Sequence, residues 1–232
     1  MRDVSLLRVS RRLVLAATTS LTLTSDHAFA TEPLCRYPRS WTGVWRVDRC
    51  LEMVEGNVTT AEVAWTVSGG TGAFVPGHRE EYGVRFLLDD EVASVADWAF
   101  EICSRCALPD AAVSWDLQDE LKYQRAPRAV TAVCVEARTD LRTLSQFGAI
   151  ERWRTVPGGG GEELVLEVRR TYLPVNDLGN IEGRELIRTY SAPPGIKVDL
   201  QEPTSTSRSS LTLRPLERRL WEPIRRPTWN AG

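Results

Sequence analysis

The chain has 232 residues, with 29 lysines and arginines against 31 aspartates and glutamates, which gives a formal net charge of −2. That balance excludes the strongly basic surface on which nucleic-acid-binding domains usually rely. About two hundred residues with ordinary apolar content suffice for one well-buried domain, so we do not expect two independent domains.

The first thirty residues carry the pattern of a cleavable export signal. Arg11-Arg12 lies in a positively charged start, Leu13 to Leu23 form an apolar run diluted by hydroxyl side chains, and Ala28-Phe29-Ala30 supplies the small residues of a cleavage site. The run is too short and too polar to span a bilayer. The Ser-Arg-Arg start resembles a twin-arginine signal, which directs proteins into a bacterial periplasm or a thylakoid lumen. We therefore predict an exported protein whose signal covers residues 1–30 and no stable membrane span.

The apolar residues of the remaining chain recur mostly with the two-residue period of a strand. In residues 163–172 the apolar side chains fall on one face, which only Arg170 interrupts, while charged and hydroxyl side chains fall on the other. Turn residues separate the runs of this kind. The predicted strands cover residues 41–47, 60–68, 83–88, 129–137, 149–156, 163–172, 185–191, 196–200 and 210–214. Only residues 90–103 and 116–123 are open to a helical interpretation.

Eight or nine short strands at this spacing indicate an all-β protein with an antiparallel sheet. Closing such a sheet into a barrel removes the unpaired edges that attract other chains, so we expect a single barrel over residues 31–203. The polar run from residue 204 to 210 has the composition of a linker, and a tail rich in arginine, proline and tryptophan follows it up to residue 232. This tail either packs on the barrel or docks onto an acidic partner or a membrane face.

A short segment near the start of the barrel has a known counterpart. Trp41-Thr42-Gly43-Val44-Trp45-Arg46-Val47 resembles the Gly-x-Trp strand that opens lipocalin-like (calycin) barrels. The resemblance implies that the glycine allows a close backbone approach and that the tryptophan closes one end of the barrel. The Thr-Asp-Tyr turn of lipocalins has no full counterpart, since Thr171-Tyr172 and Thr189-Tyr190 lack the aspartate. An ordinary core tryptophan beside a turn explains the triplet equally well.

A broader set of segments resembles an uncharacterised, lipocalin-like domain family of cyanobacteria and plastids. The set comprises Tyr37 to Trp45, Val84-Arg85-Phe86, Val95 to Phe100, and the two Glu-x-x-Arg-Thr-Tyr strands that begin at Glu167 and Glu185. The similarity spans most of residues 35–200. It implies no activity. It does imply a location in a photosynthetic organelle, which for a twin-arginine signal is the thylakoid lumen of the chloroplast; the periplasm or secretion is the alternative.

Five cysteines remain after the signal, and their pairing is open. Cys103 and Cys106 have the spacing of a local disulfide or a redox dithiol, and Cys35 with Cys50 would bracket the first strand. A thiol oxidoreductase needs a thioredoxin-like βαβ context, which this strand-rich chain lacks. A single Cys-x-x-Cys also lacks the four ligands that a zinc site usually has.

Histidine is nearly absent, because only His78 remains after the signal. A multi-histidine metal centre is therefore excluded within one chain, and no Gly-x-Ser-x-Gly elbow supplies a hydrolase nucleophile. Adjacent carboxylates such as Glu80-Glu81 point to opposite faces of a strand, so we interpret them as surface charges. We assign no catalytic residue, no metal and no cofactor, and we lean towards a protein that is not an enzyme.

Two non-catalytic functions remain open. In the first, the barrel carries a small apolar ligand that is lined by Trp45, Phe86 and Trp98. In the second, the protein is an assembly or accessory protein that docks on a larger, photosynthetic complex. A thiol-disulfide oxidoreductase at Cys103 and Cys106 is a third, less favoured hypothesis. No feature of the sequence decides between the first two.

Overall fold

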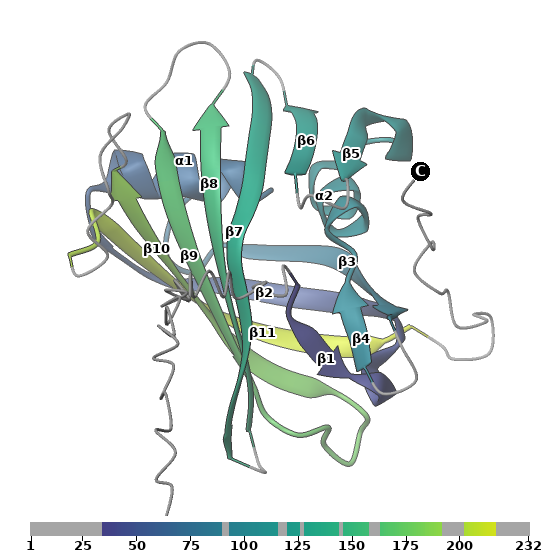
Figure 1. Ribbon diagram of the computed structural model, residues 1–232. Coiled ribbons are helices and arrows are strands. Elements are labelled where there is room, and N and C mark those ends of the chain that lie inside the picture. The colour runs from purple at the N-terminus through teal and green to yellow at the C-terminus, as the bar shows by residue number, and fades with distance from the viewer. Residues whose placement is uncertain are drawn as a thin grey trace, which may run out of the picture.

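The computed structural model describes residues 34–89, 93–115, 120–125, 128–143, 146–157, 163–191 and 202–216. Within these ranges, eleven strands form one antiparallel sheet that curls into a half-barrel (Figure 1). The strands are β1 (Arg36–Pro38), β2 (Gly43–Gly56), β3 (Arg79–Leu88), β4 (Ala93–Ala96), β5 (Val113–Trp115), β6 (Glu120–Arg125), β7 (Arg128–Thr143), β8 (Gln146–Pro157), β9 (Leu164–Tyr172), β10 (Ile181–Ser191) and β11 (Ser205–Pro215). Their order across the sheet is β1-β4-β3-β2-β11-β10-β9-β8-β7-β6-β5.

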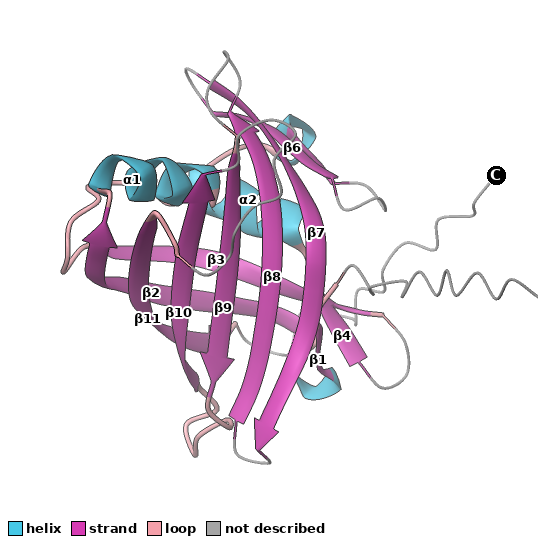
Figure 2. Cartoon of the chain, turned by 60° about the vertical axis from the view of Figure 1, so that its left-hand side comes forward, coloured by secondary structure: helices cyan, strands magenta, loops and turns pink. Residues whose placement is uncertain are grey.

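Two helices cover one end of the sheet on its concave side (Figure 2). Helix α1 (Val58–Val67) contacts β2, β10 and β11, and α2 (Trp98–Cys106) contacts β3, β5 and β6. Two single 3-10 turns, η1 (Arg39–Trp41) and η2 (Asp110–Ala112), complete the described elements. None of the helices in the described ranges has the length and apolar character needed to cross a membrane.

The prediction of an antiparallel all-β protein with a barrel-like sheet is confirmed, but eight or nine strands is too few. The expected closure is also only partial. Where β1 approaches β7, the link is a side chain: the Arg36 N–H donates to the Thr139 hydroxyl at 3.0 Å, and that hydroxyl donates to the Arg36 carbonyl at 3.1 Å. Strands β6 and β5 continue the sheet beyond this contact. The Thr139 hydroxyl thus links the backbone of β1 to β7 where the two ends of the curl meet.

The predicted strand at residues 60–68 is wrong, because these residues form helix α1. The Asn57 side chain caps the helix by accepting a hydrogen bond from the Thr60 N–H at 3.0 Å. Ala61, Ala64 and Trp65 are buried, with the three- and four-residue spacing of a helix face. The β-branched residues around them are typical of strands, but the cap and this spacing outweigh their preference.

Of the two segments open to a helical interpretation, only part of one is helical. Within 90–103 the helix α2 begins at Trp98, where Asp97 accepts a hydrogen bond from the Phe100 N–H at 3.0 Å, whereas residues 93–96 form β4. In the second segment, residues 120–123 belong to strand β6, and residues 116–119 lie outside the described ranges.

The predicted linker is also wrong, because most of residues 204–210 belong to β11, which lies between β2 and β10 in the middle of the sheet. The inward side chains of its first half are Ser205, Ser207 and Ser209, all buried where α1 packs against the strand. Small hydroxyl side chains fit this close helix–sheet contact, and they hide the strand from an analysis of apolar periodicity. The domain therefore extends to Pro215. The export signal, the strand predicted at 196–200 and residues 217–232 of the tail fall outside the described residues.

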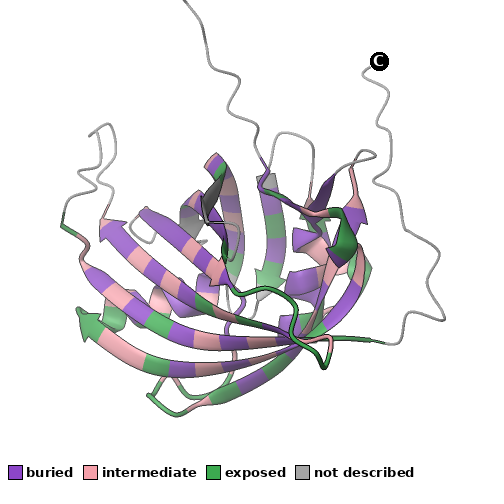
Figure 3. Cartoon of the chain, turned by 90° about the horizontal axis from the view of Figure 1, so that it is seen from below, coloured by how far each residue is buried: buried purple, intermediate pink, exposed green. Residues whose placement is uncertain are grey.

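Buried and exposed residues alternate along the strands, as Figure 3 shows. Five aromatic rings pack against one another at the end of the concave face away from the helices; they are Tyr37, Trp41, Phe86, Phe147 and Tyr172. Between these rings and the helices the interior also holds buried charged side chains.

Candidate functional site

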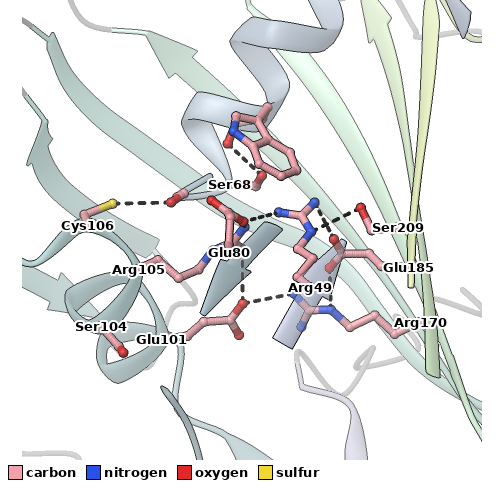
Figure 4. Close-up of polar contacts among 12 residues, drawn as sticks. Arg49, Ser68, Glu80, Glu101, Ser104, Arg105, Cys106, Arg170, Glu185 and Ser209 are labelled. Atoms are coloured by element: carbon pink, nitrogen blue, oxygen red, sulfur yellow. Dashed lines mark hydrogen bonds and ion pairs between the residues drawn. The ribbon is translucent and has the colours of Figure 1, made fainter. Parts of the chain in front are cut away.

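Three arginines and three glutamates form a closed ring of ion pairs on the concave face (Figure 4). Each carboxylate binds two guanidinium groups, each guanidinium binds two carboxylates, and all six residues are buried. In order around the ring, the nitrogen–oxygen distances are Arg49–Glu80 3.1 Å, Glu80–Arg105 3.2 Å, Arg105–Glu101 3.4 Å, Glu101–Arg170 3.2 Å, Arg170–Glu185 2.8 Å and Glu185–Arg49 2.6 Å. The ring is neutral overall, and it joins β2, β3, β9 and β10 to α2.

Each guanidinium of the ring also lies over an aromatic ring. Arg49 lies 3.9 Å from the centroid of Trp65, Arg105 lies 4.5 Å from that of Tyr82, and Arg170 lies 4.9 Å from that of Trp98. Arginine suits such sites because its planar, weakly hydrated cation binds carboxylates at its edge and aromatic rings at its face. Each buried guanidinium is thus paired with carboxylates at its edge and packed against an aromatic ring at its face. Both contacts offset part of its desolvation cost.

The ring lowers the pKa of Glu185 and of Glu80. Burial by itself raises the pKa of Glu185, but the charges of Arg49, Arg170 and Arg105 outweigh burial and lower that pKa to about 2. For Glu80, burial is again outweighed, here by Arg105, Arg49 and the hydrogen bonds of Thr71, so its pKa is lowered as well.

Glu151, on β8, behaves in the opposite way. Burial raises its pKa to about 7, despite the opposing charge of Arg170, because it lies beside the ring and not within it. The contrast shows that the ring favours the ionised form of Glu80 and Glu185, whereas burial disfavours a further negative charge at Glu151.

The structure does not bring the three predicted lining residues to one cavity. Trp45 is buried and donates its indole N–H to the Trp41 carbonyl at 2.7 Å. Phe86 lines a cavity of about 20 Å³, and Trp98, which packs 4.9 Å from Trp153, lines another of about 30 Å³. Each of these volumes is enough for only one or two water molecules. Neither of these two cavities has room for a small apolar ligand.

All five cysteines lie in the described residues, and no disulfide joins them, including the candidate pairs Cys103–Cys106 and Cys35–Cys50. The Cys35 thiol instead donates to the carbonyls of Arg138 and Ile150 at 3.3 and 3.5 Å. Burial, and then the nearby Asp110 carboxylate, raise the pKa of Cys103. A catalytic thiol requires a lowered pKa, so this environment does not favour the redox hypothesis.

On the outer face of the sheet, strands β8 to β11 line an open hollow of about 340 Å³, which we term the arginine hollow. Arg169, Arg184 and Arg208 line it from three adjacent strands. The register places Arg169 and Arg208 opposite Leu186, one on each side of it, and Arg184 is the diagonal neighbour of both. The other outward residues of the hollow are Gly148, Ile150 and Thr171.

The three arginines differ in their partners. Arg169 is half-buried and binds Glu167 at 2.6 Å, a buried carboxylate that also binds Arg152 at 3.0 Å and Arg188 at 3.6 Å. Arg184 and Arg208 are exposed, and neither forms an ion pair with any residue that the structure describes. Like charges on diagonal positions of neighbouring strands repel one another. The arginine hollow therefore has an unbalanced positive charge.

The sequence analysis missed both features for identifiable reasons. Glu80, expected at the surface, is buried in the ring, since nothing in the sequence shows which face of β3 turns inward. The one signal in the sequence was Arg170, which interrupts the apolar face of β9. An arginine on an inward face implies a buried carboxylate that pairs with it. The arginine hollow depends on the register of three strands, and the part of β11 that carries Arg208 was assigned to a linker.

Among the residues that the structure describes, no group of three or more histidine, cysteine, aspartate or glutamate side chains is arranged to hold a metal ion. Comparisons of the chain with models of known protein families, with curated proteins and with solved structures found no match.

Proposed function

We propose that the protein is an exported accessory protein which docks on a larger assembly by binding an acidic protein segment at the arginine hollow. The observation that carries the proposal is the pair Arg184 and Arg208. They are two exposed arginines on neighbouring strands that line the same hollow without a carboxylate partner among the described residues. Arginine binds carboxylates in a bidentate geometry, which gives both strength and orientation.

The openness of the hollow favours a macromolecular partner over a small metabolite. Pockets for small molecules bury most of the ligand surface, whereas the guanidinium-bearing side chains of Arg184 and Arg208 are exposed. Charged surface positions of this kind steer the encounter with a partner of opposite charge and fix its register.

The ring of ion pairs supports the proposal from the other side of the sheet. Arg170 and Glu185 belong to the ring, and their chain neighbours Arg169 and Arg184 line the hollow. Since successive residues of a strand point to opposite faces, the ring fixes the backbone from which the hollow is built. A binding site on a rigid element has less conformational freedom to lose when the partner binds.

The compartment is part of the proposal. The signal-like pattern of residues 1–30 and the resemblance to a plastid and cyanobacterial family support export to the thylakoid lumen. Because the cavities beside Phe86 and Trp98 are too small for an apolar ligand, a surface role also fits better than ligand transport.

The proposal is tested with a fluorescent hexaglutamate peptide as the probe and fluorescence anisotropy as the measurement. We expect the R184E/R208E variant to bind at least about tenfold more weakly than the unmodified protein, since each lost charge-assisted contact is worth roughly 1.5–3 kcal/mol. The matched control is R79E/R138E, which reverses the charge of two other exposed arginines. Equal loss in both variants, or no binding by the unmodified protein, would contradict the proposal.

A further inference from the structure

The loop between β9 and β10 exposes apolar side chains beside the arginine hollow. Leu173 and Val175 are each 47% exposed, and Leu178 is 82% exposed. We term these three residues the apolar loop. Figure 2 shows the connection between β9 and β10 at the end of the sheet far from helix α1. Isolated exposed leucines are common, but three apolar side chains in one short connection form a local patch.

Hydrogen bonds hold this loop in one shape. The Asn176 side-chain oxygen accepts from the Leu178 N–H at 3.0 Å and from the Asn180 N–H at 2.9 Å. The backbone adds two bonds of 2.8 Å, from the Asn176 N–H to the Asn180 carbonyl and from the Gly179 N–H to the Asn176 carbonyl. Gly179 has a φ of +80°, which favours glycine at this position. These hydrogen bonds hold Leu178 at the surface on a turn of defined conformation.

The apolar loop and the arginine hollow form one continuous surface. Arg169, Thr171 and Leu173 alternate with buried residues along the chain, so they lie in a row on the outer side. Successive members of such a row are about 7 Å apart. Thr171 lines the hollow, and Leu173 is the next outward residue beyond it.

We propose that the acidic segment bound at the hollow carries a large apolar residue two or three positions from its carboxylates, and that this residue packs on the apolar loop. This inference rests on the proposed function and specifies the partner. An extended segment rises about 3.3 Å per residue, so two or three residues bridge the distance from the hollow to Leu173. Apolar anchors beside charged contacts are the usual composition of tight protein interfaces.

The charges around the apolar loop favour a protein segment over an anionic membrane. Asp177 is exposed in the turn directly beside Leu178, and Glu182 is exposed close to Leu173 on the neighbouring strand. Both carboxylates would repel an anionic lipid surface at the point where the leucines would have to insert. A protein segment is not repelled in this way when the residues that face Asp177 and Glu182 are uncharged.

The test uses two fluorescent peptides with the protein and its variants. The acidic-apolar peptide contains Glu-Glu-Ser-Ser-Leu within a serine-glycine sequence, and the acidic peptide has serine in place of the leucine. We expect the unmodified protein to bind the first about tenfold more tightly, the effect expected from burying much of one leucine. The L173S/L178S variant is expected to lose this difference while keeping its affinity for the acidic peptide. The V135S variant, which changes another exposed apolar residue, is expected to keep the difference.

The outcomes separate this inference from the proposed function. Equal affinity of the unmodified protein for both peptides overturns the apolar contact and leaves the acidic site standing. Failure to bind either peptide overturns both. Binding to vesicles of phosphatidylcholine and phosphatidylglycerol that is lost in L173S/L178S would also overturn the inference, because it would identify the apolar loop as a membrane contact.

Discussion

Arg170 and Glu101 join the sheet to a helix: the Arg170 guanidinium, near the C-terminal end of β9, binds the Glu101 carboxylate in helix α2 at 3.2 Å. The residue that breaks the apolar face of its strand is therefore the one that attaches the strand to the helix. The pair of Glu80 and Arg105 joins β3 to the same helix, so we expect the stability of the half-barrel to depend on buried charges as well as on apolar packing.

The adjacent residues Glu80 and Glu81 provide a direct test of the ring. Glu80→Gln removes a buried charge shared by Arg49 and Arg105, and breaking a buried pair in this way typically costs about 3–5 kcal/mol. Glu81→Gln is the matched control, since Glu81 pairs with Arg46 at the surface, where an ion pair contributes about 1 kcal/mol or less. Urea denaturation measures the free energy of unfolding. Similar losses in the two variants would show that the ring does not stabilise the fold.

The lowered pKa of Glu185 predicts a loss of stability in acid. A carboxylate whose pKa is lower in the folded state stabilises the fold above its unfolded pKa, near 4.5, and this contribution disappears as the pH falls towards 2. The shift corresponds to about 3 kcal/mol. Unfolding measured from pH 5 to pH 2 should show this decline, and Glu185→Gln should flatten it. An equally steep decline in the variant would assign the effect to other groups.

The raised pKa of Glu151 predicts the opposite slope at higher pH. Its folded pKa of about 7 exceeds the unfolded value near 4.5, so the folded state holds the proton more tightly. The free energy of unfolding should therefore fall between pH 4.5 and pH 7, by up to about 3 kcal/mol, and level off above that. Glu151→Gln should remove the slope and make the protein more stable at pH 8. A variant less stable than the unmodified protein at pH 8 would contradict this.

The cap of helix α1 predicts a smaller, local effect. Asn57→Ala removes the acceptor for the Thr60 N–H and should cost about 1 kcal/mol. Val58, the next residue, is 58% exposed, and Val58→Ala serves as a control that should change stability by less than about 0.5 kcal/mol. Thermal unfolding of both variants, followed by circular dichroism, distinguishes them. An unchanged melting temperature in Asn57→Ala would mean that the cap contributes nothing.

The fold could be predicted where apolar and polar side chains alternate with the two-residue period of a strand. Residues 163–172 alternate clearly, and they form β9 almost as expected. The strand predicted at residues 60–68 is wrong because β-branched residues in a capped helix resemble a strand. The strand predicted at 210–214 lies in β11, but the first half of β11 was missed because serines occupy its inward positions beneath α1. In both cases the missing information was tertiary: which element packs against the segment.

The candidate site was less predictable than the fold. Trp45, Phe86 and Trp98 were expected to line a cavity and were found packed against other rings or backbone. The ring and the arginine hollow both depend on which residues of distant strands lie opposite one another. The pairing of β10 with β11 brings Arg184 and Arg208 together from positions 24 residues apart, and no local pattern specifies that register.

The shared carboxylates of the ring also constrain how this chain can change during evolution. A substitution at Glu101, for example, removes partners from Arg105 and Arg170 at once. Any replacement that tolerates the loss must alter the neighbouring arginines as well, so the six positions are expected to vary together. Related proteins should then keep all six side chains or exchange several of them for apolar ones, and intermediate combinations should be rare.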